Sequence, residues 1–293
     1  MQDNFLRTTA ALAVAVSAVT LAASDAGAID IAIVAAAANT ADEQNNTRFT
    51  DPRDMLLADG RFDSVDIIST TRFGGGRTPT LTELLQYDAV LTWSNDSHDD
   101  SVALGNVMAD YVDAGGGVVV AVFGNTSPNP ARQLLGRWAT GDYEVIPQGG
   151  GHIEGPATAT SAPSGFVTMD APLVGDHPIF DNVGDVRLNW TRGSTGIPFG
   201  AHRPVDETLV NGSMLLAEWE DGKTAAAVSG VYDNRVDLGV HPVSELVNAG
   251  YYDLDSDADL MIANAMFFSA TVPEPTSLAL LGLGGVAMLR RRR

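Results

Sequence analysis

The chain contains no cysteine in its 293 residues. Disulfide bonds, thiolate ligands for a metal ion and a cysteine nucleophile are therefore all excluded. A chain of this length does not need disulfides, because its own core can be large enough to stabilise it. Hydrophobic residues make up 45% of the sequence, which supplies such a core.

Basic residues are also scarce. The chain has 17 Lys and Arg against 37 Asp and Glu, a net charge of -20, and Lys223 is the only lysine. Setting aside residues 1–28 and 273–293 leaves 34 acidic and 12 basic residues. An acidic surface of this kind repels nucleic acid and anionic lipid, so nucleic acid is not expected as a partner.

The N-terminus has the pattern of a secretory signal peptide. Arg7 precedes an apolar run over residues 10–23, and the small residues Ala26-Gly27-Ala28 provide a cleavage pattern. We therefore predict a signal peptide over residues 1–28 and export across the inner membrane. The alternative is a buried N-terminal helix, but the apolar run over 29–38 is better suited to the first strand.

The C-terminus combines a proline pair, an apolar run and a basic end. Pro273, Glu274 and Pro275 precede a predicted transmembrane helix at about 277–289. The prolines stop any preceding helix, and the terminal arginines would stay on the cytoplasmic side of a membrane. A full span takes about 20 residues, so a buried helix is the alternative for this short run. Four terminal arginines, which no core could accept, argue against that alternative; they are Arg290, Arg291, Arg292 and Arg293.

This combination resembles the PEP-CTERM sorting signal of Gram-negative bacteria and covers residues 272–293. The resemblance implies recognition by an exosortase, a membrane enzyme that cleaves near the Pro-Glu-Pro motif. It also implies anchoring in the inner membrane before processing, and the cell surface or the extracellular medium afterwards. Exopolysaccharide of a biofilm-forming cell becomes an expected partner.

Between the two ends, buried strands alternate with helices. We predict strands over 29–38, 65–69, 88–94 and 118–123. We also predict three helices: one begins at Asp51, and the other two cover 81–86 and 102–114. Asp51 would cap its helix, with Pro52 in the first turn, and Asp257 would cap a last helix over 257–269. This alternation indicates an α/β domain over residues 29–271 with a doubly wound, mostly parallel sheet.

The second half of this domain is less regular. Residues 139–199 are rich in Gly, Pro and Thr and read as an irregular β-rich insertion, with short strands over 144–146 and 186–190. Residues 213–220 and 224–229 indicate two strands turning at Asp221-Gly222, followed by a short strand over 235–239.

Several segments together resemble the class I glutamine amidotransferase-like fold in its ThuA-like variant, a flavodoxin-like arrangement. They are the strand around 87–91, the helix end, glycine run and strand over 111–119, His177-Pro178-Ile179, and Asn264-Ala265 in the last helix. The resemblance implies a reactive group on the turn after the strand over 118–123. Amidotransferases place a cysteine on that turn, and ThuA-like proteins tend to have a histidine close by.

That turn departs from the pattern. It reads Gly124-Asn125-Thr126-Ser127, followed by Pro128, and a catalytic serine would need a histidine and an acid nearby. No catalytic residue is therefore assigned, and the domain is expected to lack the parent activity. The side chains expected to line any pocket follow two strands at the carboxyl edge of the sheet, where ligands bind in doubly wound folds. They are Asn95, Asp96, His98, Gly124 and Asn125.

The sequence contains two candidate metal sites, and for each the alternative is a purely structural role. His98, Asp96 and His152 could converge on an ion, although scattered histidines more often support loops. Asp253, Asp255 and Asp257 alternate as in a calcium loop but lack its glycine and glutamate, so a helix-capping acidic loop is the alternative. No cofactor other than calcium is expected.

The sequence thus favours a non-enzymatic, surface-directed protein of the cell envelope or matrix. An enzyme acting on a carbohydrate or a small amide, and a sugar- or calcium-binding module of the matrix, are the alternatives. The turn over 123–127 distinguishes them, because histidines and acids converging there would favour an enzyme and a closed apolar turn would not.

Overall fold

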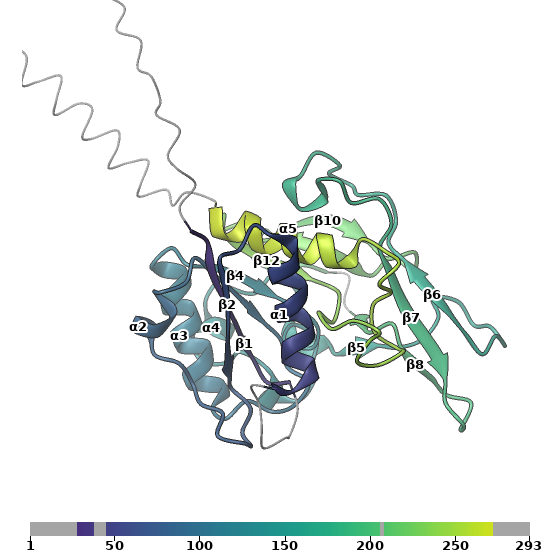
Figure 1. Cartoon of the computed structure of the whole chain (residues 1–293), viewed down its shortest axis with the longest axis horizontal. Helices are drawn as coiled ribbons and strands as arrows, with labels where there is room; N and C mark the ends of the chain where they lie inside the picture. The colour runs from purple at the N-terminus through teal and green to yellow at the C-terminus, as the bar shows by residue number, and fades with distance from the viewer. Residues whose placement is uncertain (1–27, 38–44, 206–207, 272–293) are drawn as a thin grey trace, which may run out of the picture.

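The centre of the molecule is a seven-stranded sheet, shown in Figure 1. The computed structural model describes residues 28–37, 45–205 and 208–271. The strand order is β10-β11-β12-β4-β3-β1-β2. The strands are β1 (Asp30–Ala35), β2 (Ser64–Ser69), β3 (Ala89–Thr92), β4 (Gly117–Val120), β10 (Met214–Glu218), β11 (Thr224–Val228) and β12 (Arg235–Leu238).

Most of this sheet is parallel. Strands β2, β1, β3, β4 and β12 pair in parallel, whereas β11 and β10 form an antiparallel hairpin at the edge beyond β12. The predicted α/β fold with a mostly parallel sheet is therefore confirmed. Because the five strands run in parallel, all their carboxyl ends lie at one edge of the sheet.

Helices cover both faces of the sheet, because successive strand residues point to opposite sides. Ile31 and Ile33 join the core under α1 (Thr47–Asp59) and α5 (Ala258–Thr271), whereas Ala32 and Val34 join the core under α3 (Ser101–Asp113). Two short helices, α2 (Leu81–Leu84) and α4 (Arg137–Thr140), lie beside α3. This two-sided burial explains why the parallel strands are almost entirely apolar.

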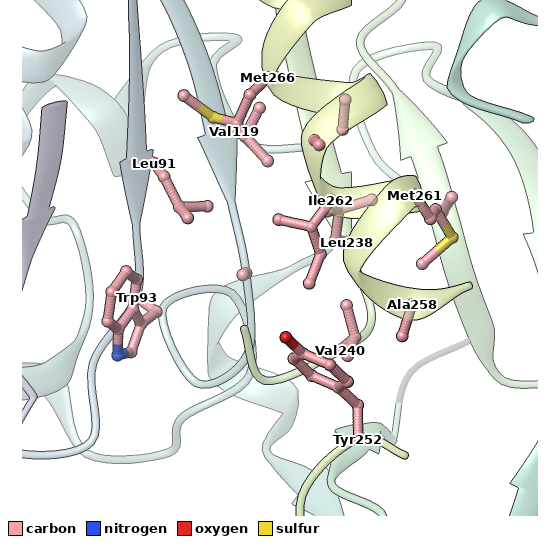
Figure 2. Close-up of a cluster of buried hydrophobic side chains, with 14 of the residues drawn as sticks. Leu91, Trp93, Val119, Leu238, Val240, Tyr252, Ala258, Met261, Ile262 and Met266 are labelled. Atoms are coloured by element: carbon pink, nitrogen blue, oxygen red, sulfur yellow. The ribbon is translucent and has the colours of Figure 1, made fainter. Parts of the chain in front are cut away.

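The last helix is the main cover of one face. Figure 2 shows Ile262 and Met266 of α5 directed toward Leu91 and Val119 on the central strands. All four side chains are fully buried. The predicted last helix is therefore formed, with Ile262 and Met266 on its buried side.

The β-rich insertion forms a separate small layer at the side of the main sheet (Figure 1). Its antiparallel sheet contains β6 (Ser164–Thr168), β7 (Arg187–Arg192) and β8 (Pro198–Gly200), and β5 (His152–Ile153) pairs with β9 (Arg203–Pro204). Short 3-10 turns, η2 (Pro130–Arg132), η3 (Gln148–Gly150) and η4 (Pro178–Phe180), connect these parts. The strand expected over 144–146 is not formed, because its residues lie in a bend that packs on β12.

The predicted start of the first helix is wrong. Helix α1 begins at Thr47, and the Asn46 side chain accepts a hydrogen bond from the Arg48 N–H at 2.9 Å. Pro52 consequently lies inside the helix. Asp51 does not cap it but accepts hydrogen bonds from the Ser244 N–H and hydroxyl at 2.7 and 2.8 Å.

The carboxylate of Asp257 also differs from its predicted role. Asp257 does precede α5, but its Oδ2 accepts hydrogen bonds from the N–H groups of Gly184 and Asp185 at 2.7 and 3.1 Å. These bonds lower the pKa of Asp257. The side chain therefore ties the insertion to the start of the helix, and only its backbone carbonyl serves the helix, through the Met261 N–H.

The predicted signal peptide and the sorting tail lie outside the described residues, apart from residue 28. Within the segments 28–37, 45–205 and 208–271, no helix is both long and apolar enough to cross a membrane. The transmembrane helix expected at about 277–289 therefore stays a prediction.

A fully buried ion pair, Arg235–Asp237, stabilises β12, which pairs in parallel with β4 and antiparallel with β11. Arg235 donates to Asp237 Oδ1 at 2.5 Å and to the Tyr143 carbonyl at 3.1 Å. Asp237 Oδ2 accepts the Ile146 N–H at 2.8 Å, so the pair also holds the segment that leads into the insertion. Burial disfavours both charges, and their mutual hydrogen bonding is what makes them tolerable.

Replacing Asp237 with Asn should leave the Arg235 charge buried without a counter-ion. We expect a loss of about 3–5 kcal/mol in the free energy of unfolding, measured by urea denaturation. The exposed pair Arg53–Asp54 supplies the control, and Asp54→Asn should leave the stability almost unchanged. Equal effects of the two substitutions would contradict this account of the buried pair.

Candidate metal centre at the carboxyl edge of the sheet

The site begins at the turn that follows β4. The Asn125 side-chain amide donates to the carbonyls of Val120 and Leu238, each at 3.2 Å. These bonds join the ends of β4 and β12 and explain why Asn125 is buried. The same turn carries Phe123, whose ring is only 5% exposed.

Three histidines surround the ring of Phe123. The ring centroids of His152, His202 and His241 lie 4.5, 4.9 and 5.3 Å from that of Phe123. The three come from different parts of the chain, since His241 follows β12 whereas His152 and His202 belong to the insertion. Histidines from other segments therefore converge on the turn after β4, and its surroundings are not purely apolar.

Glu154 completes the cluster. His152 opens β5, and Glu154 is two residues further on, so the two side chains leave the extended chain on the same side. His202 immediately precedes β9, and the β5–β9 register places His152 opposite Pro204. Strand pairing thus brings together residues that are about 50 positions apart in the sequence.

The backbone around His202 is firmly held. Ala201 has a positive φ of 46°, and its N–H donates to the carbonyls of Asn189 and Gly250 at 2.6 and 3.0 Å. Arg203 is buried and donates to Asp221 through two nitrogens, at 2.8 and 2.6 Å. The imidazole between these two residues therefore has a fixed position, as a metal ligand needs.

The donor atoms converge on Glu154. Its Oε1 lies 3.3 Å from His152 Nε2 and 3.3 Å from His202 Nδ1, and the three ligand atoms all lie within 4.8 Å of one another. Bonds of ~2.0–2.1 Å to a tetrahedral ion separate two ligands by about 3.4 Å. The two 3.3 Å distances to Glu154 Oε1 match this spacing, and the third pair of ligand atoms lies within 4.8 Å.

The electrostatics of the cluster favour a carboxylate that stays ionised. Hydrogen bonding from His152, and next from His202, lowers the pKa of Glu154 to about 2. His202 is only 4% exposed, whereas the side chains of His152 and Glu154 are 26% and 35% exposed. The cluster is thus closed on one side and reachable from solvent on the other.

The five residues predicted to line a pocket do lie at the carboxyl edge, but they do not form one constellation. Asn95 and Asp96 donate their N–H groups to the Ala36 carbonyl, and Asp96 lies 3.9 Å from Arg72. His98 hydrogen-bonds to Thr70 at 2.8 Å, on the β2 side. Gly124 and Asn125 belong to the turn beside the histidine cluster. Among the described residues, the carboxylate partner of His152 is Glu154 and not Asp96.

In the acidic loop before α5, the carboxylates of Asp253 and Asp257 have partners within the protein that account for them without calcium. Asp253 is 4% exposed and pairs with Arg187 at 2.6 Å, and its second oxygen accepts the Asp255 N–H at 3.1 Å. The Asp257 carboxylate holds the Gly184 segment, as described above. Within the residues that the structure describes, the one group of three or more acid or histidine ligands is His152, Glu154 and His202.

Sequence reasoning missed Glu154 and His202. The one local signal was the His152-x-Glu154 spacing, which puts two donors on one side of an extended segment. Nothing local pointed to His202, because the register of a two-residue strand cannot be predicted from so short a segment.

His241 is a further buried histidine beside the cluster. Its Nδ1 lies 2.8 Å from the Val122 carbonyl, and a carbonyl only accepts, so Nδ1 carries the proton. Nε2 is then an acceptor, and it is buried without a partner among the described residues. Burial lowers the pKa of His241 to about 3, which keeps the ring neutral.

Comparison with known proteins identifies the C-terminal segment. Residues 271–293 match the PEP-CTERM protein-sorting motif, and this motif implies export with processing by an exosortase. No curated protein matches the chain significantly.

Solved structures similar to the chain include a cytoplasmic protein from Salmonella typhimurium, with 10% identity, a TM-score of 0.49, and coverage of 82% of this chain and 98% of that one. A thua-like protein from Bacteroides uniformis has 14% identity, a TM-score of 0.49, and coverage of 85% and 95%. A thua-like protein from Parabacteroides merdae has 14% identity, a TM-score of 0.47, and coverage of 83% and 90%.

The burial of His98 predicts a pH dependence. Burial lowers its pKa from 6.5 to about 4, so between these values the unfolded chain binds a proton that the folded chain does not. Stability should therefore fall as the pH decreases through this window, by up to about 3 kcal/mol from this residue. Urea denaturation at several pH values measures the slope, and His98→Asn should flatten it. An unchanged slope in the variant would show that His98 does not titrate this way.

Proposed function

We propose that the chain is an exported protein of the cell envelope or matrix, sorted by an exosortase, whose α/β domain binds a divalent transition-metal ion. The PEP-CTERM match over residues 271–293 supports the sorting. The convergence of His152, Glu154 and His202 supports the metal binding, and the 3.3 Å spacing around Glu154 Oε1 is the observation that carries it.

The donor set indicates which ions fit. Two imidazoles and one carboxylate are typical of zinc and similar ions, whereas calcium takes six to eight oxygen ligands. Zinc, or a chemically similar ion such as cobalt, is therefore the ion of this proposal, in place of the calcium considered for Asp253, Asp255 and Asp257.

Three protein ligands leave a fourth position for water or another ligand. Zinc bound in this way lowers the pKa of a bound water to about 7 and supports hydrolysis. The solvent exposure of His152 and Glu154 on the open side favours this second candidate, an enzyme acting on a carbohydrate or amide. Zinc-dependent release of acetate from an acetylated sugar, lost in Glu154→Gln, would support it.

Metal binding can be measured with cobalt(II), whose visible absorption reports tetrahedral coordination. The full chain should bind one cobalt ion, and His202→Ala and Glu154→Gln should each weaken binding by roughly 100-fold or more. His177→Asn is the matched control, because His177, which precedes η4, packs on Phe268 of α5 and does not belong to the cluster. Cobalt binding that persists in both cluster variants would contradict the proposal.

The sorting proposal has its own measurement. In the native host, the intact mass of the mature protein should correspond to a start near Ile29 and an end near Pro273, since both terminal signals are removed. Replacing Pro273 and Pro275 with alanine should leave the protein in the membrane fraction with Arg293 still present. A wild-type protein that retains Arg293 would show that the tail is a plain anchor and that no exosortase processes it.

A further inference from the structure

The metal cluster is one end of a larger group of polar side chains at the carboxyl edge. The ring of Tyr251 belongs to this group. Its centroid lies 6.0 Å from that of His202 and 4.6 Å from that of His241. On its far side, the Tyr251 hydroxyl lies 3.5 Å from Arg48 Nε. Arg48, His241 and the metal ligands therefore surround two aromatic rings, those of Tyr251 and Phe123.

Arg48 stands out in a chain with so many acids. Most arginines of the described segments lie within 4.0 Å of a carboxylate, for example Arg187 with Asp253 and Arg203 with Asp221. Arg48 has no such carboxylate within the described residues, and its Nε lies 3.5 Å from the Tyr251 hydroxyl. Arg48 is half-buried, so solvent screens its guanidinium charge only in part. This charge can therefore favour an anionic ligand.

His241 adds an acceptor to the group. Its Nε2 has a lone pair, is buried, and has no donor among the described residues. A buried polar atom without a partner costs free energy, which a ligand hydroxyl would recover by donating a hydrogen bond. The His241 ring lies 4.6 Å from that of Tyr251, which Arg48 contacts, and 5.3 Å from that of Phe123, which the metal ligands contact.

We propose that this edge binds a small molecule that carries an oxyanion together with neighbouring hydroxyl groups. The oxyanion pairs with Arg48, a hydroxyl donates to His241 Nε2, and an oxygen occupies the open position of the metal ion. This inference rests on the metal binding proposed above.

A carboxylate and a phosphate satisfy this chemistry equally, because the guanidinium fork pairs with either. The probes are therefore glucuronate and glucose 6-phosphate, with neutral glucose and acetate as matched controls. Glucose has the hydroxyls without the charge, and acetate has the charge without the hydroxyls.

The experiment is isothermal titration of these four compounds into the cobalt-loaded full chain. We expect glucuronate, glucose 6-phosphate or both to bind at least about tenfold more tightly than glucose and acetate. Whichever anion binds more tightly identifies the source of the oxyanion. Binding of glucose or acetate as tight as that of both anionic sugars would overturn the proposal.

Two variants test the residues. Arg48→Gln should weaken the preferred probe roughly tenfold or more while the cobalt absorption stays unchanged, and Arg53→Gln on the same helix is the control. His241→Asn should have a similar effect, because the amide can replace Nδ1 opposite Val122 but removes the Nε2 acceptor. If His241→Asn does not fold, Arg48→Gln decides alone.

These outcomes separate the two proposals. Normal cobalt binding with no selective binding of either anionic sugar, or with unchanged affinity in Arg48→Gln, overturns the ligand inference and leaves the metal site intact. Absence of the cobalt absorption in the wild-type chain overturns the metal site and, with it, the ligand inference.

Discussion

The parallel pairing of β3, β4 and β12 is the constraint on which the rest of the structure depends. Parallel strands end at a common edge, so the turn after β4 and the segment after β12 meet there. Asn125 joins the two strand ends through the carbonyls of Val120 and Leu238, and the buried pair Arg235–Asp237 supports the same strands from inside. Phe123 and His241 are neighbours at that edge because of this pairing.

The insertion supplies the chemistry that the main sheet lacks. Strands β5 and β9 and the residues next to them bring His152 and His202 to the ring of Phe123 in the turn after β4, with Glu154 beside the two histidines. Imidazoles and a carboxylate bind an ion, and an ion with an open position can bind a further ligand.

The sequence predicted those parts of the fold that depend on local signals. Apolar runs and helical spacing identified the central strands, helix α3 and helix α5, because burial on two faces or one stripe leaves a local pattern. The start of α1 was misjudged because Asp51 and Asn46 are both suitable caps, and only tertiary contact with Ser244 assigns Asp51 elsewhere. The candidate site could not be predicted as a whole, because it depends on the register of β5 with β9.

The central claim is that His152, Glu154 and His202 together hold one transition-metal ion. Anomalous diffraction at the zinc absorption edge, from crystals of the zinc-loaded protein, tests it most directly. We predict a single anomalous peak about 2.0–2.2 Å from Nε2 of His152, Oε1 of Glu154 and Nδ1 of His202. A peak at other residues, or no peak within bonding distance of these three atoms, would contradict the account.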